Sequence, residues 1–323
     1  VYDQTHAAVI GLADGGFVVA FADQVRDSSG YGTYAQRYDA SGTPIGSDFL
    51  VNSYLPYDQY LPALSALKDD PSTSGTNESG FVAVWRSLYQ DGSGWGIFGQ
   101  RFDASGNKVG AEFQVNTNTS GNQYNPTVVT LTNGDFVVVW SDESDYSVLG
   151  QRYTAGGVAV GGAFMVSTPD LPSNQELWPH ATALSNGGFV VAWDSYSGLL
   201  NDYIDVWGQQ FDATGAKVDG PVRLSQTSAD AQHHPVVAGL ANGNFVAAWA
   251  SNAEDVPGQG GYGVFQRLFG TPGSVARQEN PQLLDLESSV TLNENAVNAT
   301  PQLIDPGLRV IDGDSANFAG GTL

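Results

Sequence analysis

The chain has 323 residues, of which 34 are acidic and 12 basic, so its formal net charge is −22. This charge disfavours nucleic acid or an anionic membrane as a partner. The absence of Cys excludes disulfides, Cys-based metal sites and thiol catalysis. No apolar run approaches the length of a transmembrane helix, so we predict no direct membrane insertion. The acidity favours a protein that holds divalent cations or works in salt water, and a solvated acidic surface is the alternative.

One apolar hexapeptide occurs five times along the chain. Its first Phe recurs in steps of 64, 55, 53 and 56 residues, at Phe17, Phe81, Phe136, Phe189 and Phe245. The first step is long because nine extra residues lie between Leu67 and Phe81. A regular period of this length predicts repeats that bury their apolar surfaces against one another.

Each repeat has the pattern of four antiparallel strands. In the third repeat, Pro126–Leu131 leads through Asn133-Gly134 into Phe136–Trp140, and Asn-Gly between apolar runs is a strong hairpin signal that predicts a type I′ turn. The FVVVW run has no polar alternation, so both of its faces should be buried, as in a propeller blade and unlike a sandwich. We therefore predict an all-β fold, a β-propeller of about five four-stranded blades.

The repeats divide the chain into two parts. The propeller is expected over residues 1–277, with repeats at about 1–52, 53–116, 117–167, 168–225 and 226–277. The fifth repeat lacks a clear outer strand, so ring closure should use a strand from upstream of Val1 or Ser274–Gln278. Residues 278–323 contain short strand patterns without the repeat, and we predict a linker followed by the start of a small β-sandwich.

The loops after the second strands vary in length and are rich in acidic residues, which makes their face of the ring the expected binding face. Ca²⁺ takes several carboxylate and carbonyl oxygens. The candidate ligands in these loops and in the tail are Asp91, Asp142, Asp145, Asp202, Asp205, Glu294, Asp312 and Asp314. The alternative is that these residues only form turns.

Aromatic residues of the same face are candidates for stacking on sugars, namely Tyr31, Trp95, Tyr124, Tyr146, Trp178 and Trp207. Tyr31, Trp95 and Tyr146 lie in one column, six residues before the Arg of a recurring Gln-Arg pair. A recurring aromatic is also expected from packing between blades, so both interpretations stay open.

Two further columns have candidate roles. His6 and His234 lie just before the first strand of their repeats, where they would form a shared metal or anion site or remain ordinary surface histidines. The Arg column is expected to hold adjacent blades in register through carboxylates such as Asp39 or Asp103, or through backbone carbonyls. Its members are Arg37, Arg101, Arg152 and Arg267.

The segments SVTLNENAVNATPQLID and VIDGDSANFAGGTL resemble the start of the cadherin-like modules of very large bacterial proteins of the RTX, type I-secreted class. The GQRFDASGNKVGAEFQVNT and NGDFVVVW phrases are similar to the blade repeats that accompany such modules. The resemblance implies export to the cell surface, calcium-dependent folding, and roles in adhesion, surface coating or matrix. The glycine-rich nonapeptide repeats of that class are absent, so no individual propeller residue is implied as a calcium ligand.

The expected inner strands carry no acidic residue, and no nucleophile-elbow, zinc-protease or phosphate-loop motif is present. We therefore predict a non-catalytic extracellular module that acts in surface structure or adhesion with calcium dependence, and not an enzyme. Its expected partners are other domains of the same large chain, surface glycans or further copies of itself. The alternatives are a lectin-like, carbohydrate-binding propeller and then a glycan-active enzyme, whose carboxylates would project into the central funnel.

Overall fold

The computed structural model describes residues 3–24, 26, 29–68, 80–167, 174–197, 204–225, 231–252 and 262–270. The tail at 278–323, with its predicted cadherin-like start, lies outside these residues. In the part described, no helix is long and apolar enough to cross a membrane.

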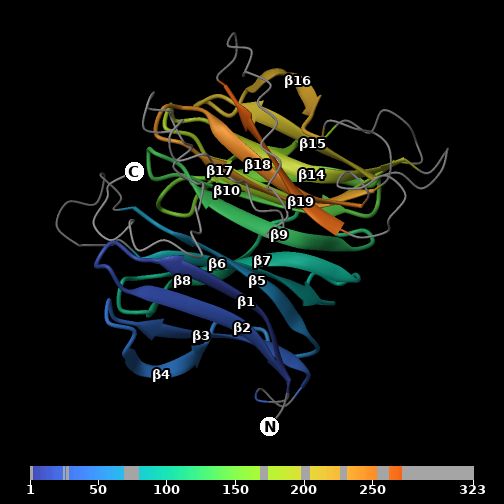
Figure 1. The fold of residues 1–323 in the computed structure, drawn as a ribbon. Helices are drawn as coiled ribbons and strands as arrows, with labels where there is room; N and C mark the ends of the chain where they lie inside the picture. The colour runs from blue at the N-terminus through green and yellow to red at the C-terminus, as the bar shows by residue number, and fades with distance from the viewer. Residues whose placement is uncertain are drawn as a thin grey trace, which may run out of the picture. The chain divides into compact units, whose positions relative to one another are not determined.

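Each repeat forms one antiparallel sheet whose strands lie side by side in chain order (Figure 1). The first sheet contains β1 (Gln4–Gly11), β2 (Phe17–Gln24), β3 (Tyr31–Tyr38) and β4 (Pro44–Leu50). The second contains β5 (Gln59–Ala66), β6 (Phe81–Leu88), β7 (Trp95–Phe102) and β8 (Lys108–Gln114). The third contains β9 (Gln123–Thr130), β10 (Phe136–Asp142), β11 (Ser147–Tyr153) and β12 (Ala159–Met165). The fourth contains β13 (Asn174–Ala183), β14 (Phe189–Ser197), β15 (Ile204–Phe211) and β16 (Lys217–Arg223), and the fifth contains β17 (Gln232–Gly239), β18 (Phe245–Asn252) and β19 (Tyr262–Phe269).

The hairpins between first and second strands form where Asn-Gly and Asp-Gly were predicted to turn the chain. In the third sheet the Gly134 amide donates to the Leu131 carbonyl at 3.1 Å. Gly134 has φ of 93°, whereas Asn133 is not among the residues with positive φ. A type I′ turn needs positive φ at both central residues, so that turn type is wrong, and the connection is a longer loop closed by a left-handed Gly.

The sheets stack face to face through four apolar clusters, each of which joins two sheets that are consecutive in the chain. All seven residues of β10 are buried, as the unbroken apolar run predicted. In the first and last sheets, β2 and β18 bury alternate residues, because each of these sheets packs one face on a described neighbour. The all-β fold is confirmed, and five stacked antiparallel sheets are consistent with a β-propeller.

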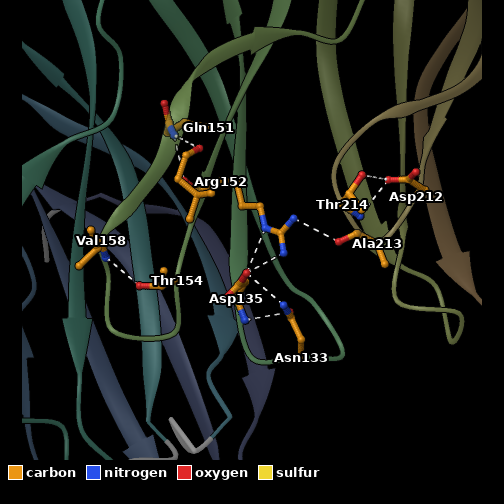
Figure 2. Close-up of polar contacts among 10 residues, drawn as sticks. Asn133, Asp135, Gln151, Arg152, Thr154, Val158, Asp212, Ala213 and Thr214 are labelled. Carbon is orange, nitrogen blue, oxygen red and sulfur yellow. Dashed lines mark hydrogen bonds and ion pairs between the residues drawn. The ribbon is translucent and has the colours of Figure 1, made fainter. Parts of the chain in front are cut away.

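The Arg column links neighbouring sheets. Arg152 Nη2 donates to Asp135 Oδ2 at 2.7 Å, and Nη1 donates to the Ala213 carbonyl of the next sheet at 3.1 Å (Figure 2). Arg101 Nη1 likewise donates to the Gly156 carbonyl at 2.6 Å. The interpretation that this column bridges blades through carbonyls is confirmed for these two residues.

The carboxylates that pair with this column differ from those expected. Arg37 pairs with Asp14, a residue of its own first hairpin, just as Arg152 pairs with Asp135. Asp39 Oδ1 instead accepts from the amides of Ser41 and Thr43 within its own turn, and Asp103 Oδ1 accepts in the same way from Ser105 and Asn107. The predicted pairing with Asp39 or Asp103 is therefore wrong, because those carboxylates are used to close turns.

Every first strand contains a bulge at the same repeat position, where its register against the second strand shifts. The residue at each bulge has positive φ, between 51° and 54°, although none of the five is Gly; they are His6, Leu61, Asn125, Trp178 and His234. Left-handed backbone is uncommon for residues with a Cβ, and a bulge bends the strand and re-aims its side chains. These bulges set which residues face the spaces between the inner strands.

Replacing Arg152 by Ala should lower the free energy of unfolding by about 2 kcal/mol, because it removes a charge-assisted contact between two sheets. Urea denaturation measures this loss. Arg26→Ala is the matched control, since the Arg26–Asp48 pair is exposed and should contribute less than about 1 kcal/mol. Equal losses for the two variants would contradict the bridging role.

Candidate functional site

A cavity of about 330 Å³ opens between the fourth and fifth sheets. Its lining comes from β13, β14, β15 and β17, and consists of Gln175, Leu177, Trp178, Asp194, Tyr196, Ile204, His233 and His234. Leu177 pairs with Asp194, and Tyr196 pairs with Ile204, so strand alternation presents these four side chains on one face of the sheet. An aromatic and apolar lining with few polar groups is typical of a small-molecule site.

Trp178 is placed in the cavity by the bulge of β13. Its φ is 51° and its side chain is 43% exposed, although it is the largest apolar group of the lining. Its ring lies 5.3 Å from that of His234, in an edge-to-face arrangement. The indole therefore has accessible surface beside a polar ring, which suits stacking against a sugar.

Asp194 is the only carboxyl group among the described residues that line the cavity. Asp194 is only 4% exposed. Its Oδ2 accepts a hydrogen bond from the main-chain amide of His234 at 3.1 Å. Oδ1 is buried and makes no hydrogen bond within the described part of the chain. Burial raises the pKa of Asp194 to about 7, against which the His234 amide acts weakly. This group therefore keeps its proton to a much higher pH than an ordinary carboxyl group and can donate it.

The two histidines of β17 supply the other titratable groups of the lining. Burial, and next the charge of His234, lower the pKa of His233. Its imidazole is consequently neutral at pH 7 and able to accept a proton. A carboxyl with a raised pKa and an imidazole with a lowered one thus face one cavity.

Other buried acids near the strand ends belong to the repeat rather than to a site. Ser195 Oγ donates to Glu176 Oε1 at 2.9 Å, and Glu176 occupies the column that holds Gln4, Gln59, Gln123 and Gln232 in the other sheets. Gln4 Nε2 makes the equivalent contact with Asp23 Oδ2 at 2.8 Å. The column of Asp194 instead holds Ala22, Arg86, Ser141 and Ala250, so Asp194 is a departure from the repeat.

The described acids that were predicted as calcium ligands accept hydrogen bonds from side chains of the protein. Asp91 accepts from Asn116 Nδ2 at 3.0 Å, and Asp142 Oδ1 accepts from Ser144 Oγ at 2.6 Å. Asp145 accepts from Ser147 Oγ at 2.5 Å, and Asp205 from Ser225 Oγ at 3.3 Å. The contacts of Asp142 and Asp145, and that of Asp91 Oδ1 with the Ser93 amide at 3.1 Å, are the turn-forming alternative that the sequence left open, whereas Asp205 contacts a residue of the neighbouring strand segment.

No cluster of three or more His, Cys, Asp or Glu suited to a metal ion occurs in the described residues. Asp202, Glu294, Asp312 and Asp314 lie outside them. Calcium binding therefore stays a prediction from the sequence.

The predicted aromatic residues separate into four places. Trp178 lines the cavity, whereas Tyr31, Trp95 and Tyr124 gather with Tyr60 around Arg86 between the first three sheets. Trp207 packs against the core between the third and fourth sheets. The backbone carbonyl of Tyr146 accepts from the Glu176 amide at 2.9 Å, which links the third and fourth sheets.

The two histidines of the predicted shared site have different partners. The ring of His6 lies 4.4 Å from that of Tyr60, while His234 contacts Trp178. The structure therefore places His234 in the cavity and His6 beside the aromatic group around Arg86.

Replacing Asp194 by Asn should change the pH dependence of stability in a defined direction. The ordinary pKa is 3.8 and the folded value is about 7, so the folded state holds the proton more tightly. The free energy of unfolding of the native protein should fall by on the order of 4 kcal/mol as pH rises from about 4 to 7 through this group. Asn mimics the neutral form, so urea titrations should give equal stability near pH 4 and a more stable variant at pH 8. A difference that does not vary with pH would contradict the buried carboxyl.

The sequence matches no known family model and no curated protein. The structure is similar to the α-L-arabinanase of Penicillium chrysogenum in complex with arabinobiose, with a TM-score of 0.56 and 16% identity over 82% of each chain. It is similar also to the α-L-arabinofuranosidase Arb93A of Fusarium graminearum, with a TM-score of 0.58 and 14% identity over 82% of each chain. Identities this low show a shared fold.

These likenesses correct the functional prediction. The similar proteins are glycan-cleaving enzymes, which contradicts a non-catalytic module of adhesion or surface structure and the statement that the protein is not an enzyme. Adhesion and membership of the RTX class receive no support from them. The prediction rested on the absence of acidic residues from the expected inner strands, whereas the carboxyl group that lines the cavity, Asp194, lies on β14, the second strand of its sheet.

Proposed function

We propose that this protein binds and hydrolyses a glycan in the cavity between the fourth and fifth sheets. The observation that carries the proposal is Asp194, a buried carboxyl whose Oδ1 has no partner among the described residues, in a cavity beside the exposed Trp178. The similarity of the fold to an arabinanase and an arabinofuranosidase supports the same class of chemistry. Arabinose-containing oligosaccharides are accordingly the first substrates to test.

The cavity supplies groups for each proton movement of hydrolysis. Asp194 in its protonated form donates to the glycosidic oxygen, which leaves with the departing sugar as the bond to the anomeric carbon breaks. A water molecule adds to that carbon, and the neutral imidazole of His233 accepts its proton. Glycosidases generally use two carboxyl groups, and in this cavity the imidazole takes the place of the second.

Trp178 and Tyr196 give the cavity its binding surface. Both are aromatic side chains of the lining, and sugar rings present apolar faces to such groups while their hydroxyls meet polar neighbours. Gln175 adds an amide to the same wall. Binding by the aromatic groups and proton donation by Asp194 are separable roles.

The experiment compares cleavage with binding in three variants. Asp194→Asn should lower kcat on arabino-oligosaccharides by a factor of about 100 to 10,000, the usual contribution of a general acid, while calorimetric binding persists. Trp178→Ala should weaken binding. Asp145→Asn removes a carboxylate that only closes a turn and is expected to leave both properties unchanged.

Two outcomes would overturn this proposal. Cleavage by Asp194→Asn at the rate of the native protein would remove Asp194 from the reaction. Sugar binding that depends on Trp178, without cleavage of any oligosaccharide in the panel, would show a binding protein and no hydrolase.

Action outside the cell forms part of the same proposal. The large acidic excess and the absence of Cys support it, since both suit an exported protein. Immunodetection in the culture medium of the producing cells tests it, and retention within intact cells would overturn it.

A further inference from the structure

Arg86 occupies the same place in the second sheet as Asp194 does in the fourth. Each follows the last Trp of the apolar hexapeptide, Trp85 or Trp193. Arg86 pairs with Tyr60 across β5 and β6, as Asp194 pairs with Leu177 across β13 and β14. The repeat thus presents a guanidinium between the second and third sheets at the position where it presents a carboxyl between the fourth and fifth.

Three aromatic rings surround this guanidinium. Its carbon lies 4.4 Å from the ring centroid of Trp95, 5.2 Å from that of Tyr60 and 5.6 Å from that of Tyr124. The rings come from β7, β5 and β9, so two sheets contribute to the group. Tyr31 and His6 extend it, with rings 5.0 Å and 4.4 Å from that of Tyr60. We call these six residues the Arg86 cluster.

The guanidinium of Arg86 makes no hydrogen bond or ion pair with any described residue, and its Nε is buried without an acceptor. By contrast, Arg37 and Arg152 pair with Asp14 and Asp135. The chain has 34 acidic residues for 12 basic ones, so a missing counter-charge does not reflect a shortage of carboxylates. A partly buried cation without a counter-ion is costly, and cation–π contacts offset only part of that cost.

Two acidic groups beside the cluster, Glu143 and Asp58, accept hydrogen bonds from groups other than Arg86. Tyr124 Oη contacts Glu143 Oε2 at 3.4 Å, and Asn122 Nδ2 also donates to that carboxylate. Asp58 Oδ1 accepts from the Tyr31 amide at 2.9 Å and acts on Arg86 only through its charge. No carboxylate of the described residues pairs with the planar guanidinium fork, which can bind a ligand carboxylate through two parallel hydrogen bonds.

We propose that the Arg86 cluster binds the carboxylate of a uronic acid residue, with Trp95 and Tyr124 packing against the sugar. That the ligand is a sugar rests on the proposed glycan-hydrolysing function, whereas the recognition of a carboxylate rests on Arg86 alone. A polyanionic chain would be repelled by a net charge of −22, so the ligand is a mainly neutral glycan that carries isolated uronate residues.

The test measures binding of a neutral galactose trisaccharide and of the same trisaccharide with one galacturonate by calorimetry. The native protein should bind the uronate form at least tenfold more tightly. Arg86→Gln should abolish this preference, and Arg86→Lys should weaken it, because an ammonium group lacks the fork. Arg26→Gln removes an equal charge from an exposed pair with Asp48 and should keep the preference.

A second readout reports the charge at the site directly. Burial, and next the charge of Arg86, lower the pKa of His6. Bound uronate should therefore raise the pKa of His6 in an NMR titration, and Arg86→Gln should raise it without ligand. Should Arg86→Gln fail to fold, Arg86→Lys and the His6 titration of the native protein decide the question.

The two proposals can fail separately. Asp194→Asn should retain the uronate preference, so a loss of cleavage in every assay with the preference intact would overturn only the hydrolase. Equal affinity for the two trisaccharides, or a preference that survives Arg86→Gln, would overturn the uronate site. Acetate bound as tightly as the uronate trisaccharide would also overturn it, since the sugar would then contribute nothing.

Discussion

The burial of both faces of the second strands in the three middle sheets, β6, β10 and β14, is the constraint on which the rest of this structure depends. A sheet whose second strand is apolar on both sides cannot be stable alone, and must pack each face against another sheet. In β10, residues Phe136 to Trp140 are at most 1% exposed, and they contribute to two different apolar clusters. Stacking therefore fixes the position of every strand end, and the functional groups lie at those ends.

The same constraint explains which parts of the fold could be predicted. Strand order, hairpin positions and double burial follow from local patterns, since the Asn-Gly turns and FVVVW runs need no distant partner to be recognised. The partner of Arg152 could not be read in this way. Asp135 and Ala213 come from two turns, 17 residues before it and 61 after it, and only stacking brings them together. The bulges could not be predicted either, because Leu61, Asn125 and His234 share a backbone conformation but no chemical class.

The candidate site was missed for a different reason. The Asp residues of the loops were predicted to bind calcium, yet Asp91 and Asp142 accept hydrogen bonds that close turns. Glu176 replaces a Gln without leaving the pattern, since it still hydrogen-bonds the residue opposite it, although Glu176 accepts where Gln4 donates. Asp194 and Arg86 are a different case from Glu176, because the same column holds Ala or Ser in the other three sheets. No contact of the repeat requires a charged side chain at this position. In a repeat protein the residues that interrupt a column without a structural substitute are the ones to examine for function.

The two interruptions respond to one environment in opposite ways. A carboxyl buried between sheets can avoid the cost of its charge by taking up a proton, and so becomes an acid that operates near neutral pH. A guanidinium cannot lose its charge under any physiological condition, so it must be compensated by aromatic faces, by a counter-ion or by both. Arg86 has the aromatic faces and lacks the counter-ion among the described residues. The same repeat position thus holds a proton donor in the fourth sheet and a cation that can bind an anion in the second. A glycan with both neutral and acidic residues could interact with both groups.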